Sequence, residues 1–387
     1  MRWGLFSFLE RELTRTVPVC LLFSRSGSYA VVSEAMRAAA LLAIEEVNAA
    51  GGPVAFDLIE ADPGGDPRAY IDAARDILEN RKVKHVIGCY TSSSRKDVLP
   101  YFEKHDALLW YPSHYEGFET SDNVVYTGAA PNQHVIPLAR YVLARGWTRA
   151  FFVGSNYIWA WENNRILRDV MTSAGGTVLG ERYFPVGETD LDAVIGQIVE
   201  ARPDFVFSTL IGESAYAFYR RFRAAMPDGV DQARDMPVAS CSLAEPELAQ
   251  IGPEAADGHL SSSVYFSTVT TRENERFKAV WRKRFPELGH PSADAEASYI
   301  AGHLLARAIE RAGDPALGPV RRSVAGLSLD APQGPVAVDP NNHHVAMRTR
   351  IGRSTRAGTF EILTVSPAPV RPDPYLVWEE EFRRQPS

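Results

Sequence analysis

The chain has 387 residues, of which 45% are hydrophobic and 23% charged, and its formal net charge is −7. This length exceeds what one compact core accommodates, so we expect two lobes. The acidic balance argues against nucleic acid or an anionic membrane as the main partner. No apolar run approaches the roughly 18 residues of a membrane span. Cys20, Cys89 and Cys241 lie far apart in apolar runs, which predicts buried thiols in a reducing compartment and no metal site.

The first sixteen residues lack the pattern of a secretory signal. Glu10, Arg11 and Glu12 interrupt the apolar residues, and no small-residue cleavage site follows. We therefore expect a cytoplasmic protein. Residues 1–16 form either a short helical leader or a segment that results from a start codon placed too early.

From Val17 onward, strand patterns alternate with helix patterns. Continuous apolar runs such as residues 18–23 are typical of strands covered on both faces. In the first half we expect strands at residues 18–23, 54–59, 84–89, 107–111 and 124–127. Helices are expected at 33–48, from the turn at 62–67 to about 80, and at 95–104.

The same rhythm restarts at Pro131. Here we expect helices at residues 132–145, 162–174, 191–201 and 213–225, and strands at 149–154, 177–184, 205–210 and 237–240. Strand 260–266, helices 271–284 and 293–312, and strands 333–338 and 359–365 follow. Repeated strand–helix units predict an α/β protein with two doubly wound parallel-sheet lobes.

Three of the predicted strands end in aromatic side chains beside a hydroxyl or an amide. Ligands of open α/β sheets bind at the carboxyl ends of the strands, so these ends are expected to form one pocket. Hydroxyls and phenols donate and accept hydrogen bonds, whereas flat rings limit the size of a guest. No acid–base pair for the two charges of an amino acid is evident there, which favours a neutral ligand. The three strand ends are residues 87–96, 108–116 and 151–159.

Ten short phrases, in order along nearly the whole chain, give this sequence a family resemblance. The chain resembles the type I periplasmic-binding-protein superfamily. Within it, the chain is similar to the amide-binding regulators of aliphatic amidase operons, with urea- and short-amide-binding transport proteins as close relatives. The phrases are residues 22–24 (LFS), 62–67 (DPGGDP), 88–90 (GCY), 94–96 (SRK), 115–119 (YEGFE), 130–133 (APNQ), 207–209 (FST), 330–336 (DAPQGPV), 341–343 (NNH) and 371–375 (RPDPY).

The resemblance implies a clamshell of two lobes with the ligand cleft between them. The first lobe would hold residues 17–130 and 258–335, and the second would hold 131–257 and 336–377. Carried over by position, the resemblance implies six amide contacts, which are the candidate site residues: Tyr90, Ser92, Tyr111 and Ser113 from the first lobe, Tyr157 and Trp159 from the second. The chain departs from the family pattern beside or at these contacts. Ser113 replaces a usual threonine, His114 a usual proline and Trp159 a usual tyrosine.

Other conspicuous residues have plainer interpretations. We expect one serine of residues 92–94 to be a helix cap and His343–His344 to be a surface or loop pair. Arg95 and Lys96 are interpreted as a solvated helix start, with the alternative that this basic pair shapes the electrostatics of a nearby cleft. Trp161 and Trp281 are interpreted as packing residues. Residues 93–96 and 121–123 match two motifs of serine β-lactamases, but the third motif is missing and the architecture differs.

The resemblance implies a cytoplasmic sensor of short aliphatic amides that controls amidase expression. Its protein partner would be an RNA-binding antiterminator, and it would need no cofactor, no metal and no direct contact with nucleic acid. Two alternatives stay open: a substrate-binding protein of an ABC transporter for urea or short amides, and an enzyme acting on amides. The ligand (acetamide, a longer amide, formamide or urea) and a homo-oligomeric state also stay open.

Overall fold

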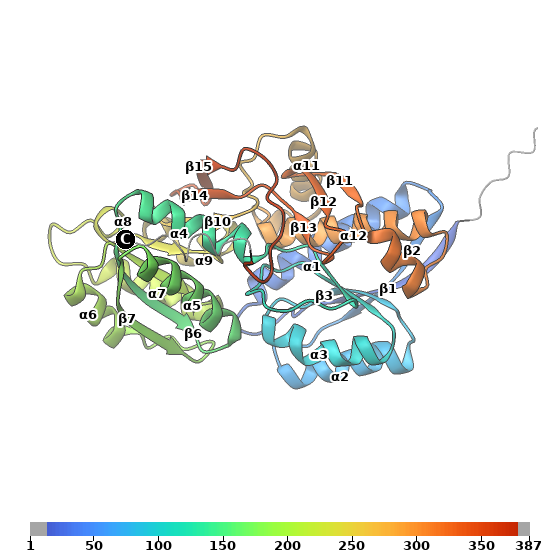
Figure 1. The fold of residues 1–387 in the computed structure, drawn as a ribbon, viewed down its shortest axis with the longest axis horizontal. Coiled ribbons are helices and arrows are strands. Elements are labelled where there is room, and N and C mark those ends of the chain that lie inside the picture. Colours follow the sequence, from blue (N-terminus) through green and yellow to red (C-terminus); the bar gives the residue numbers. More distant parts are fainter. Residues whose placement is uncertain (1–13, 378–387) are drawn as a thin grey trace, which may run out of the picture.

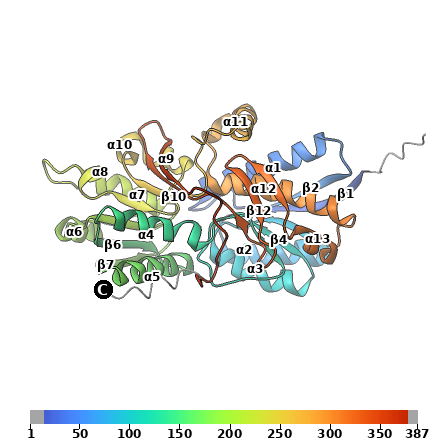
Figure 2. The same cartoon turned by 45° about the horizontal axis from the view of Figure 1, so that its top comes forward.

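The computed structural model of the protein describes residues 14–377, so most of the expected leader lies outside the described residues. The first strand–helix series (blue to cyan) and the second (green to yellow) lie at opposite ends of the long axis (Figures 1 and 2). Each series builds its own sheet. We call each large sheet with its covering helices the first and the second lobe. The predicted α/β class is confirmed.

The sheet of the first lobe has five parallel strands; a helix connects each of the first four to the next, and a loop of residues 112–123 leads to the fifth. Successive side chains of the first strand alternate between two cores: Val17 and Val19 face α1 (Ala30–Ala49) and α12 (Ala293–Ala312), while Cys20 and Leu22 face α2 (Pro67–Arg75) and α3 (Ser92–Lys104). The strand order is β2 (Val54–Ala61), β1 (Arg15–Leu22), β3 (His85–Gly88), β4 (Leu108–Tyr111) and β5 (Val124–Tyr126).

The helices of the first lobe begin and end at recognisable signals. Ser292 caps α12 by accepting a hydrogen bond from the Ala295 amide at 3.1 Å, and Gly313 ends it in the left-handed region at φ +66°. The predicted helix 293–312 is therefore confirmed. The helices are α1 (Ala30–Ala49), α2 (Pro67–Arg75) with the π-helical η1 (Asp76–Asn80), α3 (Ser92–Lys104), α11 (Arg272–Arg284), η3 (Pro286–Leu288), α12 (Ala293–Ala312) and α13 (Leu317–Val324).

The sheet of the second lobe has seven strands. The five neighbouring strands at one end of the sheet pair in parallel, and antiparallel pairing joins the remaining two to them. Phe151 and Val153 face one core and Ala150 and Phe152 the other, so both faces are covered. The order is β15 (Phe360–Val365), β14 (Arg350–Ser354), β10 (Leu260–Ser263), β9 (Val238–Ser240), β8 (Phe205–Thr209), β6 (Arg149–Ser155) and β7 (Thr177–Phe184). Its helices are η2 (Pro131–Gln133), α4 (Val135–Ala144), α5 (Ile158–Ser173), α6 (Asp192–Ala201), α7 (Gly212–Ala224), α8 (Gln232–Asp235), α9 (Glu245–Ile251) and α10 (Pro253–Ala256).

Sheet membership differs from the predicted lobe bounds at two places. Strand β10 pairs with β9 and β14 in the second sheet, although the prediction returned the chain to the first lobe at residue 258. The small sheet of β11 (Ser328–Ala331), β12 (Gly334–Val338) and β13 (Val345–Ala346) packs in the first-lobe core, beyond the predicted change at residue 336. Both differences arise because strand partners distant in sequence decide which core a segment joins. The other lobe bounds stay predictions.

The two lobes are in contact opposite the start of α1. The Glu213 amide of the second lobe donates to the Ser28 carbonyl of the first at 3.2 Å. Gly212 makes this approach possible: its φ is +59°, and a Cβ there would lie 2.0 Å from the Ser28 oxygen. We call this arrangement, in which the two lobes touch at Ser28, the closed arrangement.

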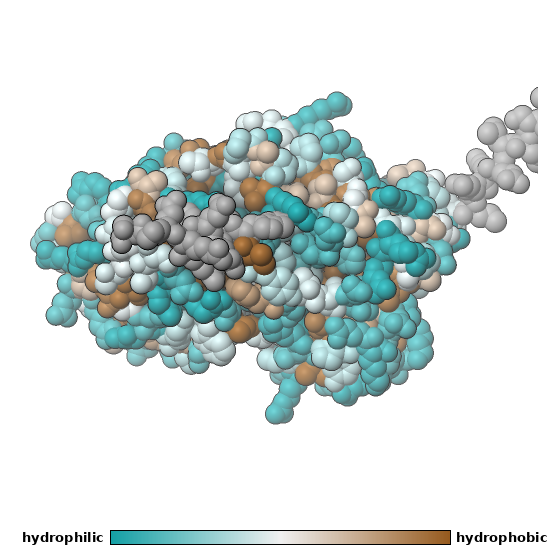
Figure 3. All heavy atoms as spheres, in the orientation of Figure 1, coloured by the Kyte–Doolittle hydropathy of each residue, from teal (hydrophilic) through white to brown (hydrophobic). Residues whose placement is uncertain are grey.

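Hydrophilic residues predominate on the molecular face seen in Figure 3, and hydrophobic residues form small, separate groups there. Such scattered groups are ordinary for a protein surface. Among the described residues, no helix is long and apolar enough to cross a membrane.

Candidate functional site

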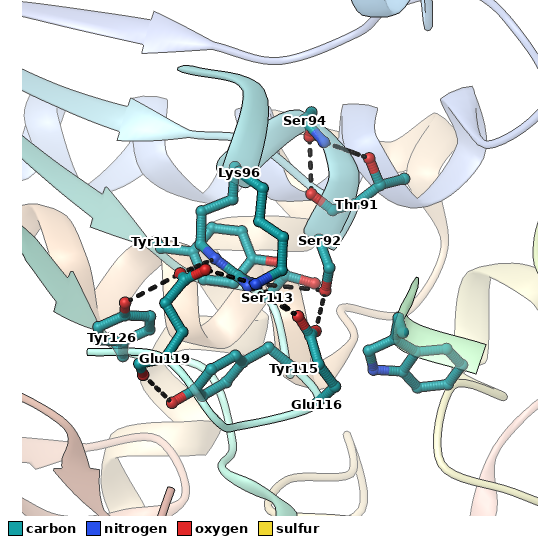
Figure 4. Close-up of polar contacts among 12 residues, drawn as sticks. Thr91, Ser92, Ser94, Lys96, Tyr111, Ser113, Tyr115, Glu116, Glu119 and Tyr126 are labelled. Atoms are coloured by element: carbon teal, nitrogen blue, oxygen red, sulfur yellow. Dashed lines mark hydrogen bonds and ion pairs between the residues drawn. The ribbon is translucent and has the colours of Figure 1, made fainter. Parts of the chain in front are cut away.

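The turn between β3 and α3 brings a row of hydroxyls to the lobe interface. Thr91 caps α3, because its side chain accepts a hydrogen bond from the Ser94 amide at 3.1 Å. The prediction that one serine of residues 92–94 caps the helix is therefore wrong, because the cap is the residue before them. Ser92, freed from capping, is 1% exposed and directs its hydroxyl to Glu116 (Figure 4).

Arg95 forms the centre of a buried ion network. Its guanidinium donates to Glu116 at 2.9 Å and to Glu119 at 2.7 Å, and Lys96 reaches Glu119 at 2.6 Å. The Arg95 side chain is 0% exposed and lies 4.7 Å from the centroid of the Tyr111 ring. The expectation of a solvated Arg95–Lys96 pair is wrong for Arg95, because segment 115–119 folds over the start of α3 and supplies two carboxylates. Lys96 stays partly exposed.

This network fixes what Ser92 can offer to a ligand. Its hydroxyl hydrogen is used toward Glu116, and its oxygen lies 3.4 Å from an Arg95 nitrogen that donates to it. A hydroxyl has one donor and two acceptor positions, so Ser92 retains one acceptor position only. Burial opposes the charged form of Glu119, yet Arg95 and Lys96 lower the pKa of its carboxyl below the ordinary value.

The end of β4 carries two further predicted contacts. The Tyr111 hydroxyl donates to the Tyr90 carbonyl at 3.0 Å, and the Ser113 hydroxyl makes only a long hydrogen bond of 3.4 Å to the His114 carbonyl. Burial, followed by the nearby charge of Glu247, raises the pKa of the Tyr90 phenol well above its ordinary value. Tyr90 and Tyr111 therefore remain neutral phenols in the closed arrangement.

The second lobe contributes Tyr157 and Trp159 at the start of α5. Their rings stack with centroids 6.2 Å apart, and Tyr157 packs against the cores of both lobes. Trp159 is 2% exposed, and the His114 ring from the first lobe meets it edge-on at 5.1 Å. The six predicted residues therefore gather at one interface between the lobes, but their role as ligand contacts stays a prediction.

An enclosed cavity of about 20 Å³ lies beside these residues. None of the six predicted residues lines it. Its polar walls come from both lobes and include His114, His134, Ser242, Ser263 and Asp294.

The His114–Asp294 pair joins this cavity to Trp159. The imidazole Nδ1 lies 3.0 Å from the Asp294 carboxylate, and the backbone amide of His114 donates to the same oxygen at 3.2 Å. The two residues are 180 positions apart. Sequence reasoning marked His114 as a departure from the family pattern but missed Asp294, because nothing local links the start of α12 with the end of β4.

Three further predictions about single residues can be compared with the structure. His344 is buried, its ring stacks on Tyr126 at 4.1 Å, and its Nε2 is hydrogen bonded to Tyr115, so the surface position expected for it is wrong. Trp161 is 43% exposed because it lies on the outer side of α5, so the expected packing role is wrong there; Trp281 is 0% exposed, and its role is confirmed. The three cysteines are buried free thiols, as predicted: Cys20, Cys89 and Cys241. Within residues 14–377, no three potential ligands gather for a metal ion.

The fold and this interface define the class of protein: a two-lobed α/β protein with polar and aromatic residues enclosed between the lobes. The chain belongs to the family described as periplasmic binding protein domain, whose model matches residues 17–381. This confirms the predicted superfamily.

Similar proteins and structures agree with this assignment. The Leu/Ile/Val-binding protein homolog 6 of Brucella abortus (strain 2308) is 24% identical over 324 residues, which cover 80% of this chain and 81% of that protein. A solute-binding protein of an ABC transporter from R. palustris, in complex with 4-hydroxybenzoate, is 20% identical with a TM-score of 0.83, covering 94% of this chain and 100% of that one. The branched-chain amino acid binding protein LivJ from Streptococcus pneumoniae, in complex with isoleucine, is 20% identical with a TM-score of 0.80. The match covers 91% of this chain and 99% of that one. The family and these relatives are binding proteins, in agreement with the prediction that the chain is not an enzyme.

Proposed function

We propose that the protein is the solute-binding component of an ABC transporter and encloses a small uncharged amide or urea between its lobes. The choice of an uncharged ligand rests on one observation: the cations at the interface are already paired with carboxylates. Arg95 and Lys96 are both engaged by Glu116 and Glu119. Within residues 14–377, no lysine or arginine lines the enclosed cavity, whereas the carboxylate of Asp294 does.

A ligand with a carboxylate would lack a partner in this environment. Burying an unpaired carboxylate is far more costly than burying a neutral amide whose polar groups are hydrogen bonded. The relatives bind 4-hydroxybenzoate and isoleucine, which both carry a carboxylate. We therefore propose that this chain differs from them in ligand class.

A second candidate is the cytoplasmic amide sensor that acts through an antiterminator. It is favoured by the ordered family phrases from Leu22 to Tyr375 and by the contact of Gly212 and Glu213 with Ser28, which only a closed arrangement makes. A partner that reads this closure would sense the ligand only if the ligand binds the open and closed arrangements differently. Cell fractionation separates the candidates: a protein outside the cytoplasmic membrane supports the transporter role, and a cytoplasmic protein that co-purifies with an RNA-binding partner supports the sensor.

Isothermal titration calorimetry with acetamide, urea, isoleucine and 4-hydroxybenzoate tests the ligand class. We expect saturable binding of acetamide or urea and none of the two carboxylates. Tight binding of isoleucine or 4-hydroxybenzoate would overturn the proposal. Steady release of ammonia from acetamide or urea would identify an enzyme instead.

A further inference from the structure

We infer that the enclosed cavity lined by His114, His134 and Asp294 is the subsite that receives the NH₂ group of the ligand. This inference rests on the proposed function and assigns an orientation to the ligand. The nitrogen would lie toward α12, and the remainder of the molecule toward Trp159, which meets the cavity through His114.

His134 supplies the clearest unsatisfied acceptor. Its Nε2 lies 2.9 Å from the Tyr115 carbonyl oxygen, which can only accept, so Nε2 carries the proton. Burial, followed by the charge of His114, lowers the pKa of His134 to about 3, so the ring is neutral and Nδ1 is an acceptor. This Nδ1 is buried without a hydrogen-bond partner in a side chain that is 1% exposed and lines the cavity. An unpaired buried acceptor is costly, so a donor at this place would be stabilising.

Asp294 supplies a second acceptor on the cavity wall. The His114 Nδ1 lies 3.0 Å from the Asp294 carboxylate and donates to it, and a carboxylate has further acceptor positions. The hydroxyls of Ser242 and Ser263 also line the cavity and can accept as well as donate. An NH₂ group directed into this cavity would therefore meet the acceptors of His134 and Asp294.

The size of the cavity agrees with a single small group. A cavity needs about 10–15 Å³ of this measure to hold one water molecule, and this cavity measures about 20 Å³. It therefore accommodates an NH₂ group, but not a whole molecule of acetamide or urea in the closed arrangement.

A nearly isosteric substitution removes the acceptor of His134. In His134→Gln the amide nitrogen can replace Nε2 as the donor to Tyr115, while the acceptor at Nδ1 is lost. His85→Gln is the matched control: His85 is 1% exposed, its Nε2 lies 2.7 Å from the Pro315 carbonyl, and its Nδ1 is likewise unpaired, but it does not line the cavity.

Calorimetric titration with acetamide and urea tests the inference. We expect His134→Gln to weaken binding roughly threefold to tenfold, the range for one neutral hydrogen bond, and His85→Gln to bind like the wild type. N,N-dimethylacetamide, which has no N–H, should bind at least about tenfold more weakly than acetamide to the wild type. If the wild type binds acetamide or urea and His134→Gln binds them equally well, the inference is overturned and the proposed function stands. If the wild type binds neither compound, both are overturned.

Discussion

Replacing Arg95 by methionine tests whether the buried ion network stabilises the folded protein. Methionine keeps most of the apolar length of the side chain but leaves the carboxylate of Glu116, whose side chain is 2% exposed, without its main partner. Breaking a buried pair by removing one partner costs about 3–5 kcal/mol, because an uncompensated charge stays buried. We expect a loss of that size in the free energy of unfolding.

The measurement is equilibrium unfolding in guanidinium chloride, since urea is itself a candidate ligand. Glu116→Gln should cost less than Arg95→Met, because a glutamine oxygen still accepts from Arg95 at 2.9 Å. The double variant should lose at least about 1 kcal/mol less than the sum of the two single losses, as expected for groups in one network.

An exposed pair on β14 and β15 provides the control. Arg353 and Glu361 lie 2.7 Å apart with side chains 49% and 56% exposed. Arg353→Met makes the same chemical change and should cost less than about 1 kcal/mol. Equal losses for Arg95→Met and Arg353→Met, or additive losses for Arg95 and Glu116, would refute the reasoning.

Three further predictions concern closure, pH and ligand size. Gly212→Ala should weaken ligand binding by at least about tenfold, because a Cβ would lie 2.0 Å from the Ser28 oxygen in the closed arrangement. The affinity is measured by calorimetry, and an unchanged affinity would show that closure does not need this contact. Burial raises the pKa of Glu247 to about 8, above that of an unfolded glutamate, so its contribution to stability is full below about pH 4.5 and is lost as the pH rises through 8. The wild type should therefore lose more stability between pH 7 and 9 than Glu247→Gln does in guanidinium unfolding; equal losses would contradict this assignment. Trp159→Phe should shift the preference from acetamide toward butyramide by roughly threefold per methylene accommodated, as titrated by calorimetry, and an unchanged ratio would place the alkyl group elsewhere.

Local pattern was a good guide to the elements and to the ends of the strands. The cap at Ser292 and the stop at Gly313 delimit α12 in the sequence itself, and continuous apolar runs indicate strands with both faces buried. Because the carboxyl ends of parallel strands meet at one edge, the predicted contacts from Tyr90 to Trp159 come together at the lobe interface.

Partners that are distant in sequence were not accessible in this way. From the local pattern, Arg95 is predicted to be a solvated helix residue. In the structure Glu116 and Glu119, which lie 21 and 24 positions further along the chain, fold over it. Strand β10 joins the second lobe because it pairs with β9 and with β14, where Ser262 lies opposite Ile351.

The sequence by itself determined the alternation of strands and helices and the chemistry available at each strand end, because periodicity and capping act over a few residues. The tertiary structure alone decided which of those groups remain available to a ligand. It joins His114 to Asp294, leaves one nitrogen of His134 unpaired, and occupies Ser92 with Glu116. Hydrogen-bond pairing between segments depends on their packing in space, to which a local pattern gives no access.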